Sequence, residues 1–192
     1  IWVALGSVAV LRDDGDRLAN RALVIDANGE LCARYEKIHL FDVDVADNHG
    51  RYRESETFSP GQEVSLTDSP FGPLGLSICY DLRFPELYRR LARAGARVLL
   101  VPAAFTHTTG QAHWELLLRA RAVENLAYVL APAQGGVHEN GRQTWGHSML
   151  VDPWGDIVNA LAQGPGVVLG ELDAGRVRQV RAQLPALEHR VL

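Results

Sequence analysis

The residue with the clearest potential for chemistry in this sequence is Cys79. It follows an apolar run of strand length and precedes an amphipathic helix predicted at residues 85–94, whose first residue is a proline. Helix N–H groups at such a strand-to-helix junction favour an anion, either a thiolate or the oxyanion of an acyl intermediate. By position alone Cys79 could equally be a small buried hydrophobe. Four polar side chains within the next seven residues favour a functional site.

A cysteine nucleophile needs a base or a cation, and a group that stabilises an oxyanion. The seven histidines are scattered, so a Cys–His pair has no specific support. Lys37 ends a predicted strand just before a long loop, where a lone lysine is more often a solvated surface residue. Glu54 and Glu56 lie in that loop and by the same reasoning are surface carboxylates. The residue types alone therefore allow an activated thiol without identifying its partner.

The elements before Cys79 form a predicted β-meander followed by a long loop. Strands are expected at residues 1–11, 21–26 and 31–39, with one turn at 12–17 and another at an Asn-Gly pair. Residues 40–70 are polar and irregular, which is typical of an active-site loop or lid, or of a disordered linker. The aromatic and aliphatic side chains of Phe41, Val43, Tyr52 and Phe58 favour the ordered alternative.

After the helix at 85–94, buried strands alternate with helices, and the chain then becomes strand-rich again. Helices are predicted at 111–126 and 174–184, and polar loops at 106–110 and 135–143. The remaining predicted strands lie at 97–103, 127–133, 144–152, 157–161 and 167–172. This order predicts an α/β protein with a mixed sheet covered by helices.

Composition limits the function classes. The 192 residues suffice for one domain, and the net charge of −4 without a basic block argues against a nucleic-acid partner. We find no apolar run of bilayer length and no signal peptide, so no membrane partner is expected. Two cysteines, Cys32 and Cys79, fit a reducing compartment, most simply the cytoplasm. No CxxC or HExxH pattern occurs, and we expect neither a metal nor a cofactor.

Five motifs resemble those of the nitrilase, or carbon–nitrogen hydrolase, superfamily. The lysine motif is YEKIHLFDVD at residues 35–44, and the cysteine motif is SICYDLRFPE at 77–86. Supporting matches lie at 53–61, 112–122 and 145–155. The resemblance extends over essentially the whole chain. It implies an α/β fold of the four-layer α-β-β-α sandwich type, formed as a single domain.

The resemblance also implies a catalytic set of Cys79, Lys37 and Glu54. Cys79 would attack an amide carbonyl to give a thioester, and Lys37 with a backbone N–H beside Cys79 would stabilise the oxyanion. Glu54 matches a supporting glutamate that orients the lysine. The family's general-base glutamate lies upstream of the lysine; nothing in residues 1–30 matches its motif, and Glu30 is not assigned that role. We therefore expect the domain 1–192 to be N-terminally incomplete.

We expect Tyr80 and Phe84, in the cysteine motif, and Thr106 to bind the substrate. Arg83 is expected to pair with a carboxylate and hold the cysteine turn. The helix after Cys79 and the C-terminal segment resemble surfaces that this superfamily uses to form homodimers.

The loop at 134–142 and the tail at 184–190 resemble the branch that hydrolyses deaminated glutathione. The related ω-amidase branch, which acts on α-ketoglutaramate and similar ω-amides, is the alternative. Two other readings remain open: a catalytically dead relative that binds a partner, and a structural domain whose Cys79 is an unreactive core residue.

Overall fold

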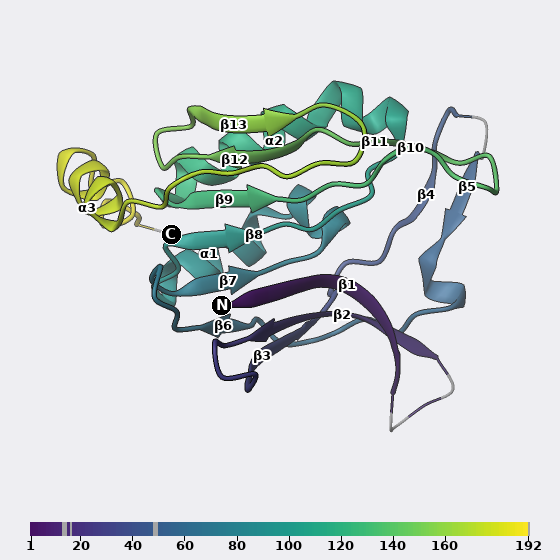
Figure 1. Cartoon of the computed structure of the whole chain (residues 1–192), viewed down its shortest axis with the longest axis horizontal. Helices are drawn as coiled ribbons and strands as arrows, with labels where there is room; N and C mark the ends of the chain where they lie inside the picture. The colour runs from purple at the N-terminus through teal and green to yellow at the C-terminus, as the bar shows by residue number, and fades with distance from the viewer. Residues whose placement is uncertain (13–14, 16, 48–49, 192) are drawn as a thin grey trace.

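A six-stranded mixed sheet forms the centre of the computed structural model, which describes residues 1–12, 15, 17–47 and 50–191 (Figure 1). Its strand order is β13-β12-β9-β8-β7-β6, in which β7, β8 and β9 are parallel and the other neighbours antiparallel. The six strands are β6 (Leu66–Thr67), β7 (Leu74–Leu76), β8 (Val98–Leu100), β9 (Tyr128–Ala131), β12 (Ser148–Val151) and β13 (Ile157–Leu161). The parallel strands are buried, which explains their almost continuous apolar sequence.

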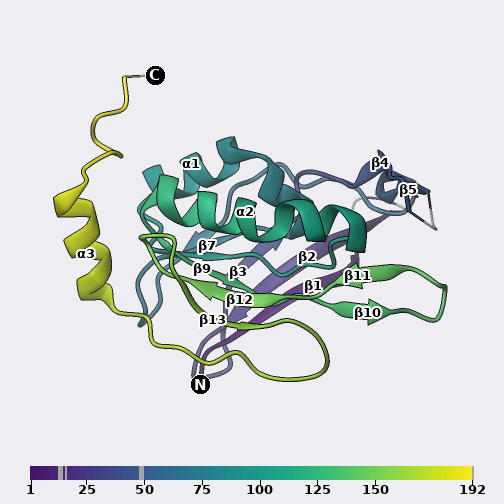
Figure 2. The ribbon, with the colours of Figure 1, turned by 90° about the horizontal axis from the view of Figure 1, so that it is seen from above.

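Two helices, α1 (Pro85–Arg93) and α2 (His107–Asn125), cover one face of this sheet (Figure 2). The proline at the start of α1 needs no hydrogen-bond acceptor there. The start of α2 corrects the predicted polar loop at 106–110, because Thr106 caps the helix and its hydroxyl accepts the N–H of Thr109 at 3.4 Å. The third helix, α3 (Ala174–Gln183), lies beyond the end of the sheet (Figure 1). None of the described helices is long and apolar enough to cross a membrane.

The predicted meander is confirmed as a separate antiparallel sheet of β1 (Val3–Leu11), β2 (Leu18–Ile25) and β3 (Leu31–Glu36). Its buried side chains, which include Val24 and Tyr35, belong to the same hydrophobic core as β7, β8 and β9. The described residues therefore build the α-β-β part of the expected sandwich, with helices, the larger sheet and the smaller sheet in succession.

The long segment predicted as irregular contains regular structure. It holds a hairpin of β4 (Asp42–Asp44) and β5 (Arg51–Arg53), the 3-10 turn η1 (Glu54–Glu56) and strand β6. Propensity did not reveal these elements because each is only two or three residues long. His49 of this segment lies outside the described residues, as do Asp13, Asp14 and Asp16 of the predicted turn at 12–17.

Three further predictions are wrong in the second half of the chain. The predicted loop at 135–143 is a hairpin of β10 (Gly135–Val137) and β11 (Gln143–Trp145). The predicted strand at 144–152 breaks between β11 and β12, where Gly146 and His147 have φ of 73° and 58°. The predicted strand at 167–172 has no ladder partner among the described residues, so its apolar side chains remain on an unpaired segment.

Candidate active site

Cys79 occupies an unusual backbone position between β7 and α1. Its φ of 51° lies in the left-handed region, which side chains other than glycine rarely adopt and which is enriched at functional sites. Cys79 opens the 3-10 turn η2 (Cys79–Arg83), and its N–H donates to the carbonyl of Pro102 at 2.9 Å. A 3-10 turn thus fills the gap between the half-buried thiol and α1, which begins at Pro85 as the sequence predicted.

Asp81 joins this turn to the segment that carries Lys37. The Asp81 carboxylate is fully buried; its Oδ2 accepts the Tyr35 hydroxyl at 2.7 Å and the Ile78 N–H at 2.8 Å. Its Oδ1 accepts the His39 N–H at 3.1 Å and lies 2.7 Å from His39 Nδ1. Burial and the neighbouring carboxylate raise the pKa of Tyr35 far above its ordinary value, so its hydroxyl stays a hydrogen-bond donor.

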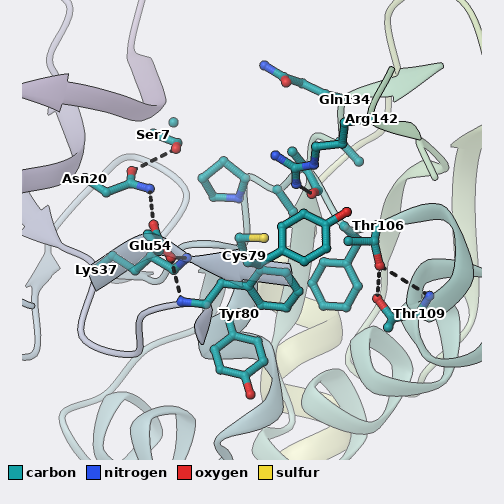
Figure 3. Close-up of a pocket in the computed structure, with 18 of the residues that line it drawn as sticks. Ser7, Asn20, Lys37, Glu54, Cys79, Tyr80, Thr106, Thr109, Gln134 and Arg142 are labelled. Carbon is teal, nitrogen blue, oxygen red and sulfur yellow. Dashed lines mark hydrogen bonds and ion pairs between the residues drawn. The ribbon is translucent and has the colours of Figure 1, made fainter. Parts of the chain in front are cut away.

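Lys37 is a buried cation held by a chain of hydrogen bonds. Its side chain is 3% exposed, and its Nζ lies 2.5 Å from Glu54 Oε2, which also accepts the Phe41 N–H at 2.7 Å. Glu54 Oε1 accepts the Asn20 amide at 3.1 Å, and the Ser7 hydroxyl donates to Asn20 Oδ1 at 2.8 Å (Figure 3). Both oxygens of Glu54 are therefore engaged in orienting other groups.

Lys37, Glu54 and Cys79 border one cleft of about 1040 Å³ (Figure 3). Tyr80 and Thr106, two of the residues expected at the substrate, border it as well. Other residues that line it include Ser7, Asn20, Tyr52, Phe105, Thr109, Gln134, Arg142 and Ser148. The cleft is large enough for a small organic molecule and brings a thiol, a cation and several hydrogen-bonding groups together.

Phe84, the third residue expected at the substrate, is not among the described residues that line the cleft. Its ring stacks on His39 with centroids 3.7 Å apart, and it meets the edge of Tyr80 at 5.3 Å. Tyr80 in turn contacts Phe41 at 5.0 Å. Phe41 and Tyr80 both line the cleft, so Phe84 and His39 extend this aromatic cluster away from the lining.

Arg83 differs from its expected role. Among the described residues it makes no ion pair with a carboxylate; its guanidinium nitrogens lie 3.3 Å from His113 Nδ1, and its Cζ lies 5.4 Å from the Phe105 ring centroid. Burial lowers the pKa of Arg83. The cysteine turn is held by the carboxylate of Asp81 instead.

Several residues at the cleft could not be assigned from the sequence. Ser7 and Asn20 lie on β1 and β2, far from the motifs, and only the sheet register brings them to Glu54. Arg142 lies just before β11 in a segment read as a loop. For Asp81, the sequence did offer a signal, because it is one of the polar residues that directly follow Cys79.

The described residues of the cleft show no metal-site pattern. In the part of the chain that the structure describes, no group of three His, Cys, Asp or Glu side chains could hold a metal ion.

Among the residues that line the cleft, Tyr52 has a pKa raised to about 12 by burial and by its hydrogen bond to Asp47 Oδ2 at 2.9 Å. Tyr52 is therefore neutral at physiological pH.

Sequence comparison places this geometry in a family. Residues 1–182 match the model of the family described as carbon–nitrogen hydrolase. The chain is 47% identical over 190 residues to a deaminated glutathione amidase of Yersinia enterocolitica, covering 98% of this chain and 66% of that protein. It is 55% identical over 175 residues to a deaminated glutathione amidase of Synechocystis, covering 90% of this chain and 64% of that protein. The chain thus spans slightly less than two thirds of the length of these curated relatives.

Structural comparison agrees. The fold superposes with a TM-score of 0.86 on Saccharomyces cerevisiae Nit3, described as a member of branch 10 of the nitrilase superfamily, at 35% identity, covering 97% of this chain and 65% of that one. This likeness confirms the predicted fold class. From the family match over residues 1–182, the relatives and this fold, it follows that the chain belongs to the carbon–nitrogen hydrolase family.

Proposed function

We propose that this chain carries the thiol chemistry of an amidase that hydrolyses a small carboxylated amide, deaminated glutathione. The observation that supports this most strongly is the cleft itself, where a half-buried thiol in a strained turn borders the same space as a buried lysine paired to a glutamate. Both relatives described above carry the name deaminated glutathione amidase, which supports the choice of substrate.

In the first half-reaction, Cys79 Sγ attacks the amide carbonyl and forms a tetrahedral intermediate. Its oxyanion is stabilised by the Lys37 ammonium and by a backbone N–H of the cysteine turn. That donor is the N–H of Tyr80, because the Cys79 N–H already donates to Pro102 and the first N–H groups of a helical turn lack intrahelical acceptors. The C–N bond then breaks, the amine leaves with the proton that the thiol has given up, and a thioester remains.

In the second half-reaction, water attacks the thioester and returns the free thiol. For deaminated glutathione the two products are α-ketoglutarate and cysteinylglycine. Glu54 acts as a positioning residue for Lys37, since both of its oxygens already accept hydrogen bonds. The general base that transfers the protons is a separate carboxylate, which we assign to none of the described residues.

Three further properties belong to the same proposal. The chain contributes a single domain over residues 1–192. The protein works in the cytoplasm, which suits its two free cysteines, Cys32 and Cys79. It acts as a homodimer, which agrees with exposed apolar side chains such as Leu116 on α2 and Val167. Light scattering after gel filtration tests the dimer.

The activity is tested by incubating the full-length protein with deaminated glutathione and measuring α-ketoglutarate. Cys79→Ala should lower turnover by about 10³-fold or more, because no other group forms the thioester. Cys32→Ala is the matched control: Cys32 is exposed and is not among the residues that line the cleft, so its removal should leave turnover unchanged. Wild-type turnover by the Cys79→Ala protein would refute the mechanism.

A further inference from the structure

Among the described residues, one cation at the cleft has no anionic partner. The cationic side chains that border it are Lys37, Arg51, Arg53 and Arg142. The first three each contact a carboxylate, and the partners are Glu54 for Lys37, Glu56 for Arg51 and Asp44 for Arg53. Arg142 forms no ion pair with any residue in the described ranges.

Arg142 is nevertheless held in a defined position. The β10–β11 hairpin presents it at the edge of the cleft, and one Nη2–H donates to the carbonyl of Ala104 at 2.7 Å. Its Cζ lies 5.5 Å from the centroid of the Tyr52 ring, within cation–π range. Its Nε is buried and has no hydrogen-bond partner among the described residues. Figure 3 shows the Arg142 side chain reaching from the hairpin into the cleft that contains Cys79.

A partly desolvated guanidinium with an unsatisfied N–H costs free energy unless an anion binds to it. Its planar fork fits a carboxylate better than any other common anionic group of a small amide. The first turn of α2, with Thr106 and Thr109 at the same cleft, adds the positive end of a helix dipole. Both features favour negative charge on the bound molecule at this side of the cleft.

We propose that Arg142 binds a carboxylate of the substrate and thereby selects carboxylated amides over neutral ones. This inference rests on the proposed amidase function and adds the specificity-determining residue to it. Arg142 takes no part in bond making; it binds the substrate equally in the ground state and in the transition state, so that its loss weakens binding and leaves the chemical step unchanged.

Kinetics of Arg142→Gln and Arg142→Lys in the full-length protein test the proposal. With deaminated glutathione or α-ketoglutaramate, Arg142→Gln should raise KM about 10- to 100-fold with kcat within about threefold, as expected for loss of a charge-assisted hydrogen bond. The KM of Arg142→Lys should lie between those of the wild type and of Arg142→Gln. Hydrolysis of the neutral amide butyramide should change by less than about threefold. An equal loss on charged and neutral amides, or no loss on either, would overturn the proposal.

The two carboxylated substrates identify the carboxylate. An effect on both substrates assigns Arg142 to the acyl side, because α-ketoglutaramate carries its only carboxylate there. An effect confined to deaminated glutathione assigns it to the carboxylate of the leaving amine. Either result supports the proposal. Arg34→Gln is the matched control, since it removes one positive charge from an exposed side chain that does not line the cleft.

A binding measurement separates this inference from the amidase function. Calorimetric titration of the Cys79→Ala protein with glutarate and with cysteinylglycine, with and without Arg142→Gln, needs no turnover. Binding of the carboxylate that Arg142 recognises should weaken about tenfold or more in the double variant. Unchanged affinity for both ligands would overturn the role of Arg142 even if the enzyme is active. If Arg142→Gln weakens binding but the wild-type protein hydrolyses no amide, Arg142 still binds the carboxylate and the amidase function is refuted.

Discussion

At the scale of single residues, Lys37 and Glu54 depend on each other. The lysine side chain is 3% exposed and the glutamate 13%, so neither charge would be tolerated in this setting without the other. Glu54 also receives N–H groups from Phe41 and Asn20, which fixes the direction in which it holds the ammonium. In the proposed mechanism this arrangement keeps the cation ready for an oxyanion before any substrate arrives.

Lys37→Ala should therefore harm both activity and stability. We expect kcat/KM to fall by about 10²- to 10³-fold through loss of the oxyanion cation, and the free energy of unfolding to fall by about 3–5 kcal/mol because Glu54 becomes an unpaired buried charge. Steady-state kinetics and urea unfolding measure the two effects.

The double variant Lys37→Ala/Glu54→Gln separates these effects. Removing the second charge should restore much of the stability without restoring activity. If the double variant regains turnover, Lys37 has only a structural role.

At the scale of elements, the turn η2 is positioned by contacts distant in sequence. Asp81 ties this turn to the end of β3 through Tyr35 and to the segment after β3 through His39, which sets the cysteine side of the cleft against the lysine side. The left-handed backbone of Cys79 is therefore maintained by a buried carboxylate and by the Cys79 N–H to Pro102 bond.

Asp81→Asn should loosen this connection while preserving side-chain volume. The amide of Asp81→Asn cannot replace the carboxylate in all four of its hydrogen bonds, so we expect the free energy of unfolding to fall by about 3 kcal/mol. We also expect the rate at which iodoacetamide alkylates Cys79 to change. Asp44→Asn, an exposed carboxylate paired with Arg53, should change stability by less than about 1 kcal/mol. If wild type and Asp81→Asn have the same alkylation rate and the same free energy of unfolding, the turn η2 keeps its conformation without the Asp81 carboxylate.

At the scale of the whole molecule, the cleft lies where the two sheets meet. β1 of the smaller sheet passes so near the end of β8 that a Cβ on Gly6 would lie 2.2 Å from Pro102 Cβ. Only glycine allows this approach, and the next residue, Ser7, begins the hydrogen-bond chain to Lys37. The packing of the two sheets therefore affects the candidate site through two adjacent residues, Gly6 and Ser7.

Gly6→Ala should consequently push the sheets apart. We expect a stability loss of about 1–3 kcal/mol from overpacking and a drop in kcat as Ser7 and Asn20 move from Glu54. Thermal unfolding and steady-state kinetics measure both. Gly15→Ala, at a position with open space around it, is the control and should be nearly neutral. A Gly6→Ala protein with native stability would mean that Pro102 can move aside without cost.

The sequence by itself determined the meander, the amphipathic helices, the buried parallel strands and the family motifs. These features follow from local periodicity, from turn residues such as Asn28-Gly29 and from contiguous side-chain patterns, all of which are readable along one chain. The short strands β4, β5 and β6 were not predicted, because they have too few residues for a periodic pattern. The cysteine and lysine stretches were likewise recognisable because each is continuous.

Only the tertiary structure decided which residues meet in the cleft. Asn20 reaches Glu54 through strand register, and Ser7 reaches Asn20. Arg142 reaches the cleft because the β10–β11 hairpin lies at its edge. Phe84 packs behind Tyr80 instead of lining the cleft, and Arg83 contacts His113 instead of a carboxylate. Apart from the Phe84–Tyr80 contact, these contacts join residues far apart in the chain. The packing of the two sheets determines their partners, a property that no local pattern encodes.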